Sequence, residues 1–225
     1  MTDFSRQALV LDFGGVISRT LFETHTLSEQ ALGLAPGTLT WRGPFDPEHD
    51  ALWRDMQADK ISERDYWMAR TREVGRLVGE TWDRMETFVQ RARGADVDAV
   101  IRPEAVAAIN AAQAAGCRLA ILSNELDLFY GAGFRERLSL MNCFEVVVDA
   151  TYTGILKPDP RSYAEVCRQL GLEPQACVFV DDQLRNVLGG QRAGLRTVHF
   201  DVTQPRTSYD QALALLGLPP LPPVI

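Results

Sequence analysis

Short apolar runs that alternate with helical segments are the feature that most restricts how this chain of 225 residues can fold. Strands that are joined through helices pair in parallel, and helices then cover both faces of the sheet. The sequence therefore predicts an α/β fold with a doubly wound parallel sheet. The expected strands are residues 8–13, 118–122, 145–149, 177–181 and 196–200.

A stretch near the N-terminal end interrupts this alternation. It contains all four tryptophans, between positions 41 and 82, and shows no clear strand. Residues 62–78 instead have apolar positions at a helical spacing, with Ser62 in position to cap the helix. We therefore expect a small helical domain inserted after the first strand. The expected boundaries are 19–97 for the insert and 1–18 with 98–225 for the α/β domain.

The composition excludes several classes of protein. With 46% hydrophobic and 24% charged residues, the chain is of the folded globular type. A formal net charge of −7 argues against a nucleic-acid backbone or an anionic membrane as the main partner. No apolar run approaches the roughly 18–20 residues of a membrane span, and the N-terminus lacks the features of a signal peptide. We therefore expect a cytoplasmic protein, and its oligomeric state is left open.

The four cysteines and three histidines have no metal-binding or catalytic spacing. Cys117 and Cys177 each begin an apolar run, where a free cysteine usually behaves as a small buried hydrophobic residue. We therefore expect structural thiols and no zinc site.

Polar residues follow the expected strands at their carboxyl ends, where open parallel sheets bind ligands. Taken singly, each could be a turn residue or a helix cap. In combination, carboxylates favour a hard cation, whereas an ammonium and the N–H groups of a helix N-terminus favour an anion. The pattern therefore indicates a site for a phosphate group and Mg²⁺. The residues are Asp12, Ser123, Asn124, Lys157, Asp181 and Asp182.

These ordered motifs resemble those of the haloacid-dehalogenase-like (HAD) phosphohydrolase superfamily. The resemblance runs from about residue 8 to 202 and puts the insert in the place of that family's small helical cap. The glycine pair, the Arg102-Pro103-Glu104 segment and the aspartate pair are most similar to the bacterial branch that acts on glucose 1-phosphate. The motifs are Asp12-Phe13-Gly14-Gly15-Val16-Ile17, Leu122-Ser123-Asn124, Lys157-Pro158-Asp159-Pro160 and Val178-Phe179-Val180-Asp181-Asp182 with Asn186.

The resemblance implies a Rossmann-like core and a Mg²⁺-dependent phosphatase for a small phosphorylated metabolite such as a sugar phosphate. Asp12 would be the nucleophile and would form an aspartyl-phosphate. The implied metal ligands are Asp12, the carbonyl of Gly14 and Asp182, supported by Asp181 and Asn186. The implied phosphate-binding groups are Ser123, the backbone of Asn124 and Lys157.

One position departs from the family pattern. Family phosphatases usually carry a second aspartate two residues after the nucleophile, as general acid and base, and here that position is Gly14. Such groups typically contribute about 10²–10⁴-fold to the rate. One interpretation is a substrate with a good leaving group, such as an anomeric sugar hydroxyl, or a proton supplied from the insert. A second is a slow or inactive protein that binds a phosphorylated metabolite for regulation.

A third interpretation is a metal-independent 2-haloacid dehalogenase, since that family branch also lacks the second aspartate. The pair Asp181-Asp182 argues against it, because attack on neutral carbon needs no Mg²⁺. A receiver-type signalling domain is also disfavoured, because its acidic pair follows the first strand rather than a late one.

The insert is expected to close over the site and to determine specificity. The candidates are Trp41, Arg42, Phe45 and Trp53, since sugars stack on indole rings and arginine pairs with polar substituents. The alternative interpretation is that the tryptophans form the core of the insert.

Overall fold

The computed structural model describes residues 4–58, 60–93, 98–131 and 133–223. These residues divide into two compact units, each with its own core. The sheet unit consists of the described residues of Met1–Arg19, Ile101–Asp127 and Arg135–Ile225. The helical unit consists of those of Thr20–Val100 and Leu128–Phe134.

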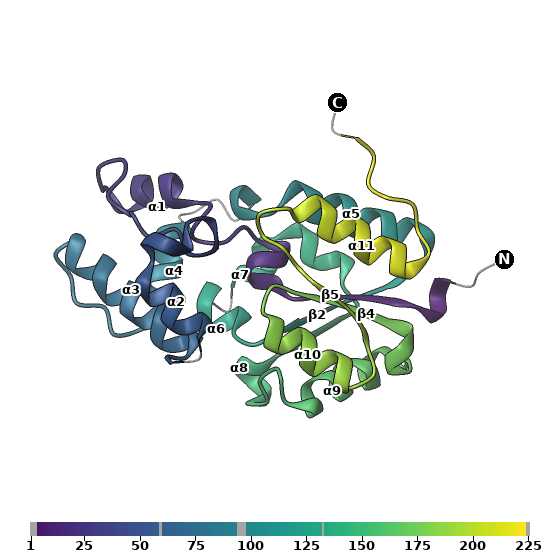
Figure 1. The fold of residues 1–225 in the computed structure, drawn as a ribbon. Helices are drawn as coiled ribbons and strands as arrows, with labels where there is room; N and C mark the ends of the chain where they lie inside the picture. Colours follow the sequence, from purple (N-terminus) through teal and green to yellow (C-terminus); the bar gives the residue numbers. More distant parts are fainter. Residues whose placement is uncertain (1–3, 59, 94–97, 132, 224–225) are drawn as a thin grey trace. The chain divides into compact units, whose positions relative to one another are not determined.

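Five parallel strands form the sheet, in the order β3-β2-β1-β4-β5 (Figure 1). This order places the first strand in the middle, and every residue of that strand is fully buried. Complete burial is expected of a central parallel strand that is covered on both faces. The doubly wound α/β fold predicted from the sequence is confirmed. The strands are β1 (Ala8–Leu11), β2 (Arg118–Ser123), β3 (Val146–Asp149), β4 (Cys177–Asp181) and β5 (Arg196–His199).

Two pairs of helices cover the two faces of this sheet (Figure 1). Helices α5 (Pro103–Ala115) and α11 (Pro205–Leu216) lie on one face. Helices α9 (Pro160–Leu170) and α10 (Leu184–Arg192) lie on the other. Within the described chain, no helix combines the length and the hydropathy needed to cross a membrane.

The sequence between the second and third strands predicts a single helix over residues 126–140, and this prediction is wrong. The chain forms α6 (Leu126–Tyr130) and α7 (Phe134–Arg137), and Gly131 between them has a φ of 83°. A left-handed residue ends a right-handed helix, and glycine adopts this conformation without a steric penalty. The described residues of the segment 128–134, which the sequence analysis assigned to the α/β domain, belong to the helical unit. A further short helix, α8 (Ala150–Thr153), follows β3.

The helical unit is built around aromatic side chains. Ser62 and Asp65 form the capping box of its longest helix, through reciprocal side-chain to backbone hydrogen bonds. Trp41 and Trp53 both pack edge-on against Phe22, with ring centroids 5.5 Å and 5.3 Å from it. Trp41 therefore belongs to the interior of the unit, whereas Trp53 is half-buried and packs against that interior. The helices are α1 (His25–Leu32), α2 (Ala51–Gln57), α3 (Glu63–Leu77) and α4 (Met85–Arg93).

A buried carboxylate connects three parts of the helical unit. Asp50, which is 1% exposed, accepts hydrogen bonds from the Tyr66 hydroxyl at 2.8 Å and the Arg70 guanidinium at 2.6 Å. It also accepts from the backbone N–H groups of Trp53, at 3.0 Å, and Gly43, at 3.2 Å. A buried charge is tolerated only when it is paired and hydrogen-bonded in this way.

Candidate active site

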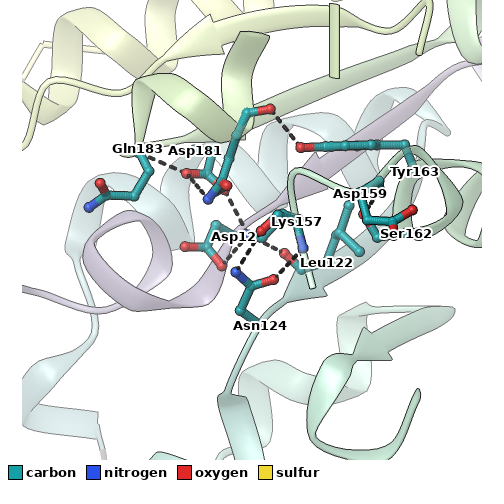
Figure 2. Close-up of polar contacts among 10 residues, drawn as sticks. Asp12, Leu122, Asn124, Lys157, Asp159, Ser162, Tyr163, Asp181 and Gln183 are labelled. Carbon is teal, nitrogen blue, oxygen red and sulfur yellow. Dashed lines mark hydrogen bonds and ion pairs between the residues drawn. The ribbon is translucent and has the colours of Figure 1, made fainter. Parts of the chain in front are cut away.

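Two carboxylates lie side by side because their strands are neighbours in the sheet. Leu11 at the end of β1 pairs with Val180 of β4, and the N–H of Asp12 donates to the Val180 carbonyl at 2.9 Å. Asp181 is the last residue of β4 and is fully buried. The carboxyl edge of the sheet thus brings Asp12 and Asp181 together, as the sequence predicted (Figure 2).

A lysine lies between these carboxylates. The Nζ atom of Lys157 is 2.9 Å from Asp12 Oδ1 and 2.7 Å from Asp181 Oδ2. It also donates to the backbone carbonyl of Leu122, in β2, at 2.8 Å (Figure 2). An ammonium group has three N–H donors, and here each has an acceptor. Lys157 is therefore fixed between three strands, and it must exchange one of these partners if it is to contact a phosphate oxygen.

The side chain of Asn124 holds the backbone of Lys157. Its Oδ1 accepts from the N–H of Lys157 at 2.7 Å, and its Nδ2 donates to the Lys157 carbonyl at 3.2 Å. The sequence analysis considered only the backbone of Asn124, as a phosphate-binding group. The structure adds a contact in which the amide positions the lysine.

Asp181 accepts hydrogen bonds on both of its carboxylate oxygens. The N–H of Gln183 donates to Oδ1 at 2.8 Å, and the amide of Asn186 donates to both oxygens at 3.1 Å and 3.2 Å. With the bond from Lys157, these contacts orient a carboxylate that water does not reach. The sequence analysis expected Asn186 to support the metal ligands, and in the structure its amide contacts Asp181 directly.

Asp182 completes a group of three carboxylates with Asp12 and Asp181. One oxygen of each lies within 4.8 Å of the others, and Asp182 is half-buried. Carboxylate and carbonyl oxygens are the ligands that Mg²⁺ and Ca²⁺ prefer, whereas zinc favours sulfur and nitrogen. The donor set therefore fits a hard divalent cation.

Burial and neighbouring charges shift the pKa values of Asp12 and Lys157 in opposite directions. Burial raises the pKa of Asp12 to about 7, although the ammonium of Lys157 acts in the other direction. Burial alone would lower the pKa of Lys157, but Asp12 and Asp181 outweigh it and the pKa is raised above its ordinary value. Lys157 thus forms ion pairs with two of the three neighbouring acidic groups, and a divalent cation would further favour the ionised form of Asp12.

Two more of the expected residues lie at the same edge of the sheet. Ser123 ends β2, is 6% exposed and pairs in register with Asp149 of β3. Gly14 has φ −71° and ψ 124°, and a Cβ placed on it would meet no heavy atom within 4 Å. The absence of a second carboxylate at position 14 is therefore not imposed by space or by backbone conformation.

Some partners in the site could not be expected from sequence motifs. The carbonyl of Leu122 and the N–H of Gln183 act through the backbone, so their side chains carry no signal. The side chain of Arg102, which reaches the loop after Asp12, was noted only as part of a motif. Of the specificity candidates in the helical unit, Arg42 is exposed and Phe45 is half-buried.

Comparison with known proteins identifies related sequences and a related fold. Residues 7–194 match the model of a family described as haloacid dehalogenase-like hydrolase. The chain is 28% identical over 163 residues to Phosphatase MT3486 of Mycobacterium tuberculosis, covering 72% of this chain and 71% of that protein. It is 26% identical over 163 residues to (S)-2-haloacid dehalogenase 1 of a Pseudomonas species, covering 68% and 71%.

Two further proteins are similar to this chain, one over part of its sequence and one in its fold. The chain is 35% identical over 118 residues to acyl-CoA dehydrogenase family member 10 of Mus musculus, which is 52% of this chain but 11% of that much longer protein. The magnesium-bound crystal structure of YfnB from Bacillus subtilis has a TM-score of 0.66 at 16% identity, covering 94% of this chain and 99% of that one. The structural likeness extends over both units.

Proposed function

Because this chain belongs to the family of haloacid dehalogenase-like hydrolases, we propose that it is a Mg²⁺-dependent phosphatase for small phosphorylated metabolites. The contact of Lys157 with both Asp12 and Asp181, beside Asp182, carries the proposal. It combines a carboxylate nucleophile with groups that can hold a cation and an anion at one edge of the sheet. The relative that is named a phosphatase supports the same reaction.

Asp12 is proposed as the nucleophile. One of its carboxylate oxygens attacks phosphorus in line, so that an O–P bond to Asp12 forms as the bond to the ester oxygen breaks. The leaving oxygen takes a proton from water. A second water then attacks phosphorus as the O–P bond to Asp12 breaks, which releases inorganic phosphate and restores the carboxylate, and the proton that this water loses neutralises the hydroxide left by the first. Lys157 orients Asp12 through the ion pair at 2.9 Å.

The cation would be held by Asp12, the carbonyl of Gly14 and Asp182. When bound, Mg²⁺ neutralises the charge on the phosphoryl group as it is transferred. Asp181 supports this arrangement, because Lys157 and Asn186 already bind its oxygens. Ser123 and the backbone N–H of Asn124 would hold the phosphate oxygens.

We propose a sugar 1-phosphate as the substrate class. Position 14 has no side chain to protonate the leaving group, and an anomeric hydroxyl is a better leaving group than an ordinary alcohol. We also propose that the helical unit acts as the cap that selects the sugar. Arg42, which is exposed, and the half-buried Phe45 and Trp53 are its candidate residues, because Trp41 is buried in the interior.

The test is phosphate release from a panel of phosphorylated metabolites, weighted toward sugar 1-phosphates, with Mg²⁺ or with a chelator. Asp12→Asn serves as the blank. Mg²⁺-dependent release that disappears in the variant supports the phosphatase. Halide release from 2-chloropropionate without Mg²⁺ would instead indicate a dehalogenase. This substrate is included because one of the relatives is named a 2-haloacid dehalogenase. Binding of the metabolites without turnover would indicate a regulatory binding protein.

A further inference from the structure

The loop directly after Asp12 does not continue as a helix. Gly14 has φ −71° and ψ 124°, and Gly15 has φ 79° and ψ −25°. Gly15, in the left-handed conformation, makes a turn within the loop that follows the proposed nucleophile Asp12. Two glycines in sequence leave such a loop with many alternative conformations. The loop therefore needs contacts from elsewhere in the sheet unit to hold one of them.

Arg102 supplies two of these contacts from the N-terminus of α5. Its Nε donates to the Gly15 carbonyl at 3.0 Å, and its backbone N–H donates to the Ile17 carbonyl at 3.0 Å. The side chain is almost completely buried, since Arg102 is 2% exposed, and its guanidinium lies 5.5 Å from the ring centroid of Phe200. A buried guanidinium is costly unless it is hydrogen-bonded, so this bond restrains both partners.

Tyr209 of α11 supplies a third contact. Its hydroxyl donates to the Val16 carbonyl at 3.0 Å, and the side chain is fully buried. The Phe13 carbonyl accepts from the N–H of Ser18 at 2.9 Å. Four of the five carbonyls of residues 13–17 thus accept a hydrogen bond from within the part of the chain that the structure describes. The remaining one is that of Gly14, the carbonyl that the proposed function assigns to Mg²⁺.

We infer that Arg102 is a positioning residue for the cation site: by holding the Gly15 carbonyl, it fixes the Gly15–Val16 peptide and so restricts the rotation of the preceding peptide, which carries the Gly14 carbonyl. This inference rests on the proposed function, because it assumes that Gly14 contributes a ligand. A guanidinium is suited to the task, since it keeps its charge and donates in a fixed direction. Residues that orient metal ligands typically change metal affinity by about 10–100-fold when they are replaced.

The test compares Mg²⁺ binding, by isothermal titration calorimetry, in the wild type and in Arg102→Gln, Arg102→Lys and Tyr209→Phe. Near-UV circular dichroism checks that each variant is folded. The Kd for Mg²⁺ should rise by about 10-fold or more in Arg102→Gln. In Arg102→Lys the rise should be about threefold, because the ammonium can still donate to Gly15 but in a less defined direction. Tyr209→Phe is the matched control: it frees the next carbonyl along the loop, so stability should fall while the Kd stays within about twofold.

A folded Arg102→Gln variant with the wild-type Kd would overturn the inference, and Arg102 would then be needed only for stability. If that variant does not fold, Arg102→Lys decides in the same way: a raised Kd supports the positioning role and an unchanged one rejects it. A wild type that binds Mg²⁺ but hydrolyses no phosphate ester would refute the proposed function alone. A wild type that binds no Mg²⁺ would refute both.

Discussion

Introducing a carboxylate at position 14 should convert this site to one that accepts poorer leaving groups. In Gly14→Asp, the new side chain would stand two residues after Asp12, where family phosphatases carry their acid–base group. The backbone angles of Gly14, −71° and 124°, are open to any L-residue, and its Cβ would meet no heavy atom within 4 Å. Neither the backbone conformation nor the space around the new Cβ therefore opposes the substitution.

The expected effects on stability and on rate differ in size. Replacing glycine at a compatible position stabilises by about 0.4–1 kcal/mol through the unfolded chain, and repulsion from the three nearby carboxylates acts against this. We therefore expect the free energy of unfolding to change by less than about 1 kcal/mol. Protonation of a basic leaving oxygen should raise the rate by about 10²–10⁴-fold, or about 3–5 kcal/mol in the activation barrier.

The assay is kcat/KM for an alkyl phosphate, such as glycerol 3-phosphate, and for 4-nitrophenyl phosphate. The aryl ester needs no acid, so only the alkyl ester should gain from Gly14→Asp. Gly14→Asn is the control, since its amide has nearly the same shape but cannot transfer a proton. If folded Gly14→Asp hydrolyses the alkyl ester no faster than Gly14→Asn, the reasoning about the leaving group is wrong.

Three further outcomes follow from contacts described above. Asn124→Ala removes both hydrogen bonds to the backbone of Lys157. The transition state should lose about 1–3 kcal/mol of stabilisation, so kcat/KM should fall by roughly 5- to 150-fold. Steady-state kinetics that match the wild type would contradict the role of Asn124 in positioning the lysine. Asp50→Ala removes the fully buried partner of the Arg70 guanidinium, while the ion pair to the more exposed Glu73 remains, and it should lower the free energy of unfolding by about 3–5 kcal/mol, which urea titration measures; a loss below about 1 kcal/mol would show that the ion pair with Asp50 is dispensable. Burial lowers the pKa of His25 to about 4 from 6.5, so between these values its imidazole takes up a proton only in the unfolded chain, whereas the raised pKa of Asp12 acts in the opposite direction. As the pH drops through this window, the free energy of unfolding of the wild type relative to that of His25→Phe should therefore fall by up to about 3 kcal/mol, and a difference that does not change with pH would contradict the assignment to His25.

The strands and the carboxylates could be predicted because both depend on local patterns. A run of apolar residues defines where a buried strand ends, and parallel strands end at a common edge. Asp12 and Asp181 were therefore expected together, and they are in contact through Lys157. The direction of the Asn124 amide could not be predicted, because it depends on the backbone of a residue 33 positions away.

The break between α6 and α7 was missed for a different reason. The apolar spacing of residues 126–140 favours a helix, but glycines at 131 and 133 were available as a signal against it. Gly131 adopts φ 83°, and it lies inside the segment Leu128–Phe134 that belongs to the helical unit. Tertiary contacts decide which of the two cores each short helix packs against. The apolar spacing of a segment does not contain this information.

The helical unit is built from two stretches of sequence, and this limits how such proteins can recombine. Ser18 and Ile101 pair across the ends of the longer stretch, so this insertion leaves and returns at neighbouring points and has the form of an exchangeable cassette. Phe129 and Tyr130 nevertheless pack on the core of that unit. Transplanting residues 20–100 alone would leave these two rings without their partners. The cassette and the segment 128–134 must therefore be inherited, or engineered, as a pair.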